Sequence, residues 1–301
     1  SMQAQTALVV ATFSRRMQLR LPQGDEVIAR IKGKRLKPVC GDRVFAEPID
    51  KETDWLITSI ADRDNELRRP NARGAVEVLA ANVELLVAMT AGSPRPDWFI
   101  VDKYLCAAEL MGAAGAVVFN KIDLEPPDAA ADAALRDYAE TGYATVRCSA
   151  RSGERVDELA AILHARTAII VGQSGVGKSS LINRLIGAER LRTASISGKS
   201  GEGRHTTVNS AMLQLPDGGA VIDSPGVRDY APALQSPAEV SIGYREIHAA
   251  GHHCRFSDCR HDREPGCAVH EGVADGTISA RRFESYRRLV TFTEQLAGKY
   301  R

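Results

Sequence analysis

Two short sequence motifs, and the order in which they occur, most constrain what this chain can fold into. Residues 172–180 read GQSGVGKSS, which satisfies the phosphate-binding P-loop pattern G-x-x-x-x-G-K-[ST]. Residues 120–123 read NKID, which satisfies N-K-x-D, the pattern with which guanine-nucleotide-binding proteins read the base. In most proteins that carry both motifs, the phosphate loop precedes the base-reading motif in the sequence. Here the base motif comes first, so the order is reversed.

The P-loop needs its residue types for physical reasons. Glycines let backbone N–H groups approach an anion without a Cβ atom in the way. Lys178 adds a charge that reaches the β- and γ-phosphates, and the Ser179 hydroxyl can bind Mg²⁺. Residues 168–171 predict a buried strand, and residues 180–186 predict a helix whose positive N-terminus faces the phosphates. The predicted phosphate-binding residues are Gly172, Gln173, Ser174, Gly175, Val176, Gly177, Lys178, Ser179 and Ser180.

Asp123 decides which base is bound. Its carboxylate can accept from guanine N1–H and the exocyclic amine, whereas adenine presents an unprotonated N1 at that edge. Such sites discriminate by as much as ~10⁴–10⁵. Residues 115–119 predict a strand before the motif, and residues 148–150 (CSA) are similar to the S-A-K/L phrase whose backbone amide meets guanine O6. The predicted base-binding residues are Asn120, Lys121, Asp123, Ser149 and Ala150, and they argue against the alternative of a P-loop kinase or ATPase.

Two further phrases follow the P-loop. Residues 223–226 read DSPG after the strand-like residues 220–222, so Asp223 is expected to hold Mg²⁺ through water and Gly226 to contact the γ-phosphate. Residues 195–207 are rich in glycine and serine, with one strongly apolar side chain. They predict a switch loop that orders on γ-phosphate and Mg²⁺, with either Thr206 or Thr207 joining Ser179 and Asp223 as a magnesium ligand.

A cluster near the C-terminus predicts a metal site. Cys254, Cys259, His261 and Cys267 form a closed set of three thiolates and one imidazole, which is typical of one structural zinc ion. His261 is the preferred nitrogen ligand because it lies between Cys259 and Cys267. The competing nitrogen ligands nearby are His252, His253 and His270.

Composition sets outer bounds. The 301 residues predict two or three domains, and a net charge of +1 does not by itself point to a nucleic-acid binder. The sequence contains no apolar run of roughly 18–20 residues and opens on no signal-peptide pattern, so no membrane contact and a cytoplasmic location are expected. The remaining cysteines, Cys40, Cys106 and Cys148, are predicted to be free buried thiols.

Three segments divide the chain. In residues 1–72, short alternating runs and turn signals predict a β-barrel of the OB type. A basic turn around Gly33 predicts RNA contact there, with a solvated surface turn as the alternative. The residues of this basic turn are Arg30, Lys32, Lys34, Arg35 and Lys37.

Residues 73–235 alternate apolar strands with helix-length stretches, which predicts a doubly wound parallel sheet. Its ligand is expected at the carboxyl ends of the strands, where all the nucleotide motifs fall. Residues 236–301 predict a zinc-binding domain with a C-terminal helix, in which Phe283, Tyr286, Val290 and Leu296 repeat at helical spacing. The arginines of that helix predict either phosphate contacts or a solvated face; they are Arg281, Arg282, Arg287 and Arg288.

Together these motifs resemble the ribosome small subunit-dependent GTPase A family over nearly the whole chain, including GRHTT, DSPGVR and LRRP at residues 67–70. The resemblance implies a multidomain α/β chain: an OB barrel closed by LRRP, a circularly permuted P-loop GTPase domain and a C-terminal zinc domain. It also implies a GTP hydrolase, with Mg²⁺ and one structural zinc, that binds the small (30S) ribosomal subunit and its rRNA. Such a protein acts late in maturation of the subunit and is stimulated by it. We expect a monomer.

One residue shapes the expected mechanism. Ras-like enzymes place a water-orienting Gln after D-x-x-G, but this chain has Val227, which has no hydrogen-bonding group. Slow basal turnover is therefore expected. His205 is the candidate for positioning the water, as the resemblance also implies, and Lys178 and Thr207 complete the predicted catalytic set. The alternative is a nucleotide-switched RNA-binding module that acts on another RNA partner.

Overall fold

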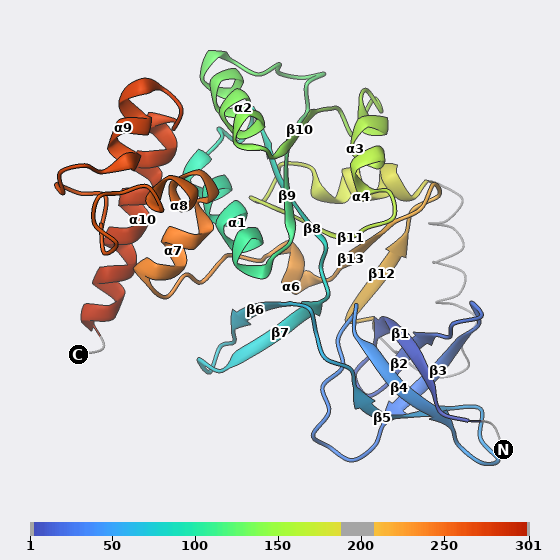
Figure 1. Ribbon diagram of the computed structural model, residues 1–301. Coiled ribbons are helices and arrows are strands. Elements are labelled where there is room, and N and C mark those ends of the chain that lie inside the picture. The colour runs from blue at the N-terminus through green and yellow to red at the C-terminus, as the bar shows by residue number, and fades with distance from the viewer. Residues whose placement is uncertain (1–2, 188–207, 300–301) are drawn as a thin grey trace.

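The computed structural model describes residues 3–187 and 208–299. Figure 1 shows a small barrel near the N-terminus, a central sheet with helices on both faces, and a group of helices near the C-terminus. The barrel and the C-terminal helices lie at opposite ends of the molecule, and the sheet between them carries the nucleotide motifs.

The barrel contains five strands: β1 (Gln5–Thr12), β2 (Met17–Arg20), β3 (Glu26–Ile31), β4 (Arg43–Pro48) and β5 (Trp55–Ile60). It closes because β1 pairs with both β2 and β4, while β3 and β5 pair in parallel. Alternate residues point inward, as the period of a strand requires, so Val9, Leu19 and Ile57 are fully buried. The predicted OB-type barrel is confirmed.

The expectation that LRRP closes the barrel was wrong. Those residues form strand β6 (Glu66–Pro70), which pairs only with β7 (Val76–Ala81) in a separate two-stranded sheet. The physical reason is the apolar side chain of Leu67, which is fully buried in the core of the next domain. The predicted boundary between residues 72 and 73 falls in the turn of this hairpin and stays a prediction.

The central sheet has the order β10-β9-β8-β11-β13-β12. The first five of these strands run parallel, and β12 runs antiparallel to β13. Every residue of β8 is buried, as expected for an apolar strand covered on both faces. The bounds are β8 (Leu85–Ala91), β9 (Ala114–Asn120), β10 (Ala144–Arg147), β11 (Thr167–Gly172), β12 (Ser210–Gln214) and β13 (Ala220–Asp223).

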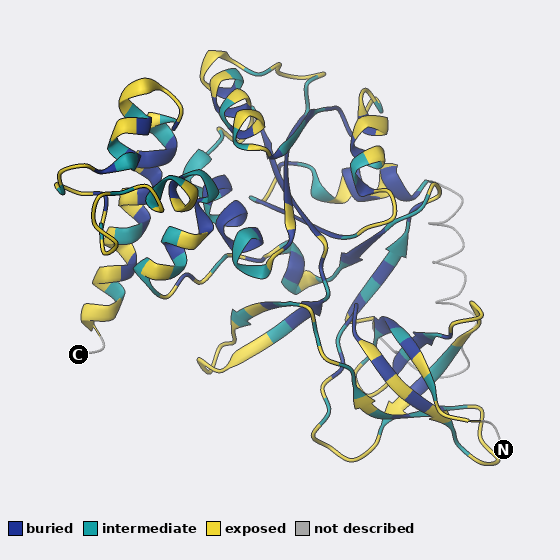
Figure 2. Cartoon of the chain, in the orientation of Figure 1, coloured by how far each residue is buried: buried dark blue, intermediate teal, exposed yellow. Residues whose placement is uncertain are grey.

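Two separate hydrophobic cores lie on the two faces of this sheet. Leu86 and Ala88 face one core with α1 (Trp98–Met111), α2 (Ala129–Thr141) and α6 (Pro225–Arg228). Leu85 and Val87 face the other with α3 (Val156–Leu163) and α4 (Lys178–Ile186). Figure 2 shows the sheet as a dark, buried layer between the helices. The predicted doubly wound sheet is confirmed.

Local signals explain where α1 and α2 begin and end. The side chains of Asp97 and Asp128 accept from backbone N–H groups of the first helical turns. Gly112 and Gly142 end the helices with φ values of 70° and 102°.

Strand β1 also joins the barrel to the central sheet. It pairs with β12 through Ala11 with Ala211 and Thr12 with Ser210, so one sheet of eleven strands runs through both domains. The Thr12 and Ser210 hydroxyls are 2.8 Å apart, and the Cys40 thiol lies 3.1 Å from the Ser210 hydroxyl. The barrel is therefore hydrogen-bonded directly to the sheet.

The C-terminal region is helical, with α7 (Pro237–Gly243), α8 (Arg245–Gly251), α9 (Ala268–Asp275) and α10 (Ala280–Lys299). Its core includes Tyr244, Phe283 and Tyr286 together with Cys106 of α1. A Cβ atom at Gly243 would lie 1.9 Å from the Cys106 sulfur, so glycine is required for this close approach of α7 to α1. Within residues 3–187 and 208–299, no helix is both long and apolar enough to cross a bilayer.

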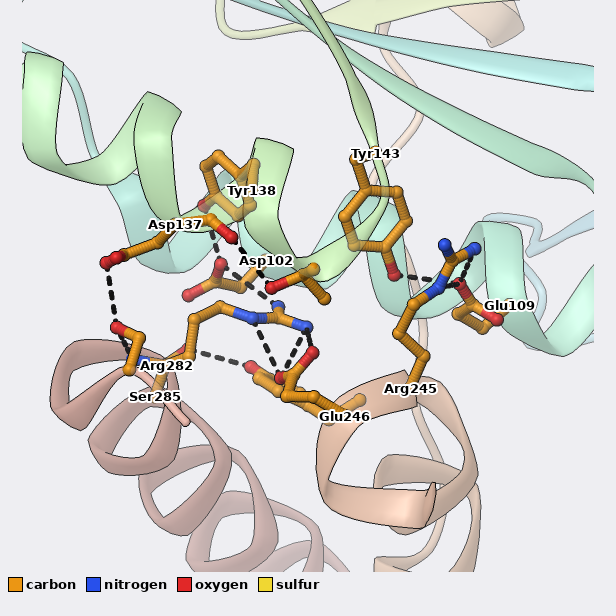
Figure 3. A network of polar contacts seen from close by, with 12 residues as sticks. Asp102, Glu109, Asp137, Tyr138, Tyr143, Arg245, Glu246, Arg282 and Ser285 are labelled. Atoms are coloured by element: carbon orange, nitrogen blue, oxygen red, sulfur yellow. Dashed lines mark hydrogen bonds and ion pairs between the residues drawn. The ribbon is translucent and has the colours of Figure 1, made fainter. Parts of the chain in front are cut away.

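Both predicted roles of Arg281 and Arg282 were wrong. Figure 3 shows Arg282 between two acidic side chains, and it is fully buried. Its guanidinium nitrogens lie 3.2 Å from Asp102 of α1 and 2.8 Å from Glu246 of α8. Arg281 lies 2.9 Å from Asp102 as well. Arg282 is internal and Arg281 is half-buried, because both compensate buried carboxylates where α10 packs on the central domain.

The other two arginines of α10, Arg287 and Arg288, are exposed. The guanidinium of Arg288 lies over the ring of Phe99, 4.0 Å from its centre, which is a cation–π contact. The solvated-face interpretation therefore fits these two residues, and only the first pair of arginines departs from it.

Candidate nucleotide-binding site and metal centre

The nucleotide motifs meet at one edge of the central sheet. Asn120 ends β9, Gly172 ends β11 and Asp223 ends β13, while residues 148–150 directly follow β10. Carboxyl ends of neighbouring parallel strands lie together, which is where open α/β sheets bind ligands. The reversed order of the motifs along the chain does not alter this arrangement in space.

Asn120 connects the base and phosphate motifs. Its side-chain amide nitrogen donates to the Val176 carbonyl at 2.9 Å, and its oxygen accepts from the Ala150 backbone N–H at 2.9 Å. The residue is 2 % exposed. A Cβ atom at Gly177 would lie 2.5 Å from the amide nitrogen, so this position of the P-loop requires glycine. One buried carboxamide thus fixes the two loops relative to each other.

Asp123 lies at the exposed base end of the site. Its carboxylate accepts from the Ser149 hydroxyl at 2.8 Å, and that hydroxyl accepts from the Ser152 backbone N–H at 3.0 Å. Lys121 has a φ of 64°, and its ammonium donates to the carbonyls of Ser93 and Gly175. The lysine side chain therefore crosses the P-loop while the aspartate remains open to solvent.

The P-loop has the backbone that anion binding requires. Gly175 and Gly177 have φ values of 87° and 96°, a region that favours glycine. Val176 is buried, so it contributes its backbone alone, whereas Gln173 and Ser174 lie on the more open part of the loop. Lys178 begins α4, followed by the exposed Ser179 and Ser180.

The ammonium group of Lys178 donates to the carbonyls of Gly172 and Gln173. Burial lowers the pKa of Lys178, Asp229 raises it, and the nearby charge of Arg228 lowers it. Lys178 and Arg228 are therefore two close cations at the phosphate end of the site, which suits a polyphosphate ligand.

Ser179 and Asp223 converge on one cation, the guanidinium of Arg228. Its Nε and one terminal nitrogen donate to the two Asp223 oxygens at 2.8 and 2.7 Å, and the other donates to the Ser179 hydroxyl at 2.6 Å. Hydroxyl and carboxylate oxygens are the ligands that Mg²⁺ prefers, so this pair fits a magnesium ion. Sequence reasoning missed Arg228: it stands in DSPGVR, but no pattern gave it a role.

Gly226, two residues before Arg228, contacts the β6–β7 hairpin. A Cβ atom there would lie 3.0 Å from a Leu79 methyl and 3.2 Å from the Arg69 guanidinium. Val227 is 1 % exposed within the core, so its side chain cannot orient a water molecule. The predicted residues His205, Thr206 and Thr207 lie outside the described residues.

Cys254, Cys259, His261 and Cys267 form a group that could hold a metal ion. Their ligand atoms all lie within 4.8 Å of one another. His261 Nδ1 is 3.6 Å from the Cys254 sulfur and 3.4 Å from the Cys267 sulfur. Tetrahedral zinc, with its usual bond lengths, separates nitrogen and sulfur ligands by about 3.6 Å. Burial lowers the pKa of His261, which favours the neutral imidazole that binds metals.

The competing histidines have other contacts. His270 Nε2 donates to the Asp262 carbonyl at 2.8 Å, and the ring of His252 contacts that of His248. Neither belongs to the four-residue group, and nor does His253.

The basic turn is exposed at the end of β3 and in the residues that follow; it comprises Arg30, Lys32, Lys34, Arg35 and Lys37. Gly33 has a φ of 75°, which permits the tight reversal. Arg30 pairs with Glu52 at 2.9 Å and lies 3.9 Å from Asp54, so its charge is partly compensated. The structure thus presents these charges to solvent.

The strand order, the P-loop and the N-K-x-D motif at one sheet edge, in reversed chain order, define a circularly permuted P-loop GTPase. A family model described as RsgA GTPase matches residues 60–232. The chain belongs to the RsgA GTPase family.

Curated relatives match nearly the whole chain. The protein named small ribosomal subunit biogenesis GTPase RsgA from Ectopseudomonas mendocina is 38 % identical, over 95 % of this chain and 85 % of the relative. The protein of the same name from Actinobacillus pleuropneumoniae is 36 % identical, over 96 % of this chain and 85 % of the relative.

Two solved structures have the same architecture. YjeQ from Thermotoga maritima superimposes with a TM-score of 0.77 at 28 % identity, covering 97 % of this chain and 99 % of the other. YloQ, which is described as a circularly permuted GTPase, gives a TM-score of 0.77 at 22 % identity, with coverages of 97 % and 96 %. At that identity the second likeness shows the fold alone.

Proposed function

We propose that this chain hydrolyses GTP on the small ribosomal subunit and acts in maturation of that subunit in the cytoplasm. The observation that carries the proposal is the convergence of Asn120, Asp123 and the P-loop at one sheet edge. The names of the relatives, small ribosomal subunit biogenesis GTPase, supply the partner. In this proposal the chain acts as a monomer with domains at residues 1–72, 73–235 and 236–301.

Guanine selectivity is assigned to the base end of the site. Asp123 is exposed and oriented by Ser149, so its free lone pairs can accept from guanine N1–H and the exocyclic amine. The backbone of Ala150, held by Asn120, lies beside it. A site of this kind leaves its carboxylate without a partner if adenine enters, so ATP is rejected.

The phosphate end is assigned to hydrolysis. Mg²⁺, which neutralises charge on the β- and γ-phosphates when bound, would be held by Ser179, Asp223 and one of Thr206 and Thr207. Lys178 adds a second positive charge there. Since Val227 is buried, we assign the positioning of the attacking water to His205, with the small subunit fixing its loop.

A GTPase assay with and without purified small subunits tests this proposal. Wild-type protein should hydrolyse GTP slowly alone and faster with subunits. His205→Ala should bind GTP and subunits normally but lose most of the stimulated rate, whereas Lys178→Ala should lose nucleotide binding and both rates. Full stimulation of His205→Ala would place the positioning of the water elsewhere.

We assign zinc to the Cys₃His group in a structural role. Four protein ligands leave no open position for substrate or water, so the ion would hold the loop between α8 and α9.

The basic turn is assigned to rRNA phosphates. Phosphate contacts release counterions, so each lost charge should lower the salt slope of binding by about 0.7–0.9. A double change of Lys34 and Arg35 to Ala is the test, with subunit affinity measured across salt concentrations. A variant with unchanged affinity and unchanged slope would assign the turn to ordinary surface.

A further inference from the structure

The guanidinium of Arg228 occupies the position between Ser179 and Asp223. It uses three donors on three oxygen atoms at 2.6 to 2.8 Å, two of them on the Asp223 carboxylate. The hydrogen bonds to Asp223 raise the pKa of Arg228 above its usual value, so the guanidinium stays charged. The contact joins the first turn of α4 to the end of β13, two elements brought together only by the fold.

Ser179 and Asp223 are also the residues to which the proposed function assigns Mg²⁺. A guanidinium on these oxygen atoms and a Mg²⁺ ion held by them, directly or through water, would be two cations within one small site, and their mutual repulsion makes them compete. We propose that Arg228 is a positioning residue that competes with Mg²⁺: it holds Ser179 and Asp223 together and yields them when Mg²⁺ enters with the nucleotide. This inference rests on the proposed function.

Among the described residues, there is room for the displaced side chain. A hollow of about 460 Å³ lies beside Arg228, lined also by Asn209, Ser224 and Asp229. The arginine side chain is 37 % exposed, and Asp229 is an exposed carboxylate that can accept the released guanidinium. The backbone of Arg228 is fixed, since its N–H donates to the Ser224 carbonyl at 3.0 Å. Release by rotation of the side chain is therefore compatible with this backbone.

The competition predicts how nucleotide affinity depends on Mg²⁺. At low Mg²⁺ the guanidinium compensates Asp223, which would otherwise repel the phosphates across a short distance. At high Mg²⁺ the guanidinium must be displaced, which opposes binding. Removing Arg228 should thus weaken binding at low Mg²⁺ and leave it equal or stronger at high Mg²⁺. Coupling between two such ligands is typically 5- to 150-fold.

The test measures affinity for a fluorescent GDP analogue at free Mg²⁺ from micromolar to millimolar. Free Mg²⁺ is set by dilution, because a chelator would also act on the Cys₃His group. In Arg228→Ala the ratio of affinity at high Mg²⁺ to that at low Mg²⁺ should rise on the order of ten-fold over wild type. In Arg228→Lys the same ratio should rise less, because an ammonium keeps the charge but cannot bridge three oxygens. The control Arg20→Ala removes an arginine paired with Glu26 in the barrel and should match wild type.

The outcomes separate this proposal from the proposed function. If Arg228→Ala changes affinity by the same factor at every Mg²⁺ concentration, Arg228 is an ordinary phosphate contact and the competition is overturned. Wild-type protein that binds no guanine nucleotide would overturn the proposed function as well.

Discussion

Asn120 shows at the scale of one residue how the nucleotide site is held together. Its carboxamide satisfies a carbonyl of the P-loop and an N–H of the segment after β10, both buried. An aspartate here would lose the donor and a leucine would lose both partners, leaving buried polar groups unpaired at about 1–3 kcal/mol each. The first residue of N-K-x-D therefore organises the site, while our proposal assigns recognition of the base to Asp123.

Replacing Asp123 with Asn should exchange base specificity. An amide can donate to the xanthine oxygen, so the variant should lose its preference for GTP and gain binding to xanthosine nucleotides. Competition by GTP, XTP and ATP against a fluorescent GDP analogue measures this. Asp157→Asn, an exposed change on α3, serves as control and should keep guanine preference. Retained guanine preference in Asp123→Asn would refute the assignment.

The buried thiols predict how stability depends on pH. Cys40, Cys106 and Cys148 are free and buried, as predicted, and burial raises the pKa of Cys148 from 9.0 to about 11. The folded chain keeps this proton when the unfolded chain loses it. The contribution of the buried Cys148 thiol to the free energy of unfolding is therefore full below about pH 9 and is lost as pH rises to 11.

Cys148→Ala should remove this dependence. Between pH 9 and 11, the difference in unfolding free energy between wild type and variant should shrink by about 2–3 kcal/mol at most. Urea unfolding at several pH values measures it. Parallel curves for the two proteins over this range would contradict the assigned pKa of Cys148.

At the scale of elements, α10 is attached to the central domain by charge as well as by apolar contact. Asp102 and Arg282 are both fully buried, and Tyr138 of α2 donates to Asp102 at 2.6 Å. Arg282 also lies over the Tyr244 ring, 4.4 Å from its centre. Helices α1, α2, α8 and α10 thus share one buried network (Figure 3).

Arg282→Met should destabilise the chain by about 3–5 kcal/mol, because Glu246 would lose its buried partner and, among the described residues, Asp102 would keep Arg281 as its one remaining cation. Arg287→Met, on the same helix but half exposed, should cost about 0.5 kcal/mol or less. Denaturant unfolding compares the two. Equal losses would show that the buried network contributes no more than a surface contact.

At this scale, the sequence predicts a feature where the residues that cause it are neighbours in the chain, and it does not where those residues meet only in the fold. The strands of the central sheet were predictable because each is an apolar run followed by a motif with its own geometry, as at Asn120 and Gly172. The prediction of a phosphate contact or a solvated face for Arg282 was wrong, because its partners Asp102 and Glu246 are distant in sequence. The same holds for Leu67, which belongs to the core on one face of the central sheet and not to the core of the barrel. The role of Arg228 was hidden because Ser179 comes close only in the folded chain.

At the scale of the whole molecule, a zinc ion bound to the Cys₃His group should stabilise the fold of the C-terminal region. A structural zinc ion contributes ~10–16 kcal/mol of folding free energy in small modules. Chelation or Cys259→Ser should therefore unfold the region around α9 while the central sheet stays folded. Hydrogen exchange should show protection lost near Cys254–Cys267 and kept in β8 and β11.

His270→Ala is the matched control, because His270 adjoins the group without belonging to it. This variant should keep its protection. Loss of GTP hydrolysis with unchanged exchange in the C-terminal region would contradict a structural role for the metal.

The permuted chain order also has a mechanical consequence. In the ordinary order the free ends of this domain would adjoin α3 and β11, but here residues 164–166 join those elements directly. The chain instead leaves the domain after β13 and α6, and it enters through the β6–β7 hairpin, which touches Gly226. Both flanking domains are therefore tethered at the segment that we expect to contact the γ-phosphate. A shift of α6 upon hydrolysis would therefore be transmitted to the C-terminal helices through residues 229–236, which link α6 directly to α7. No new contact between the domains would have to form first.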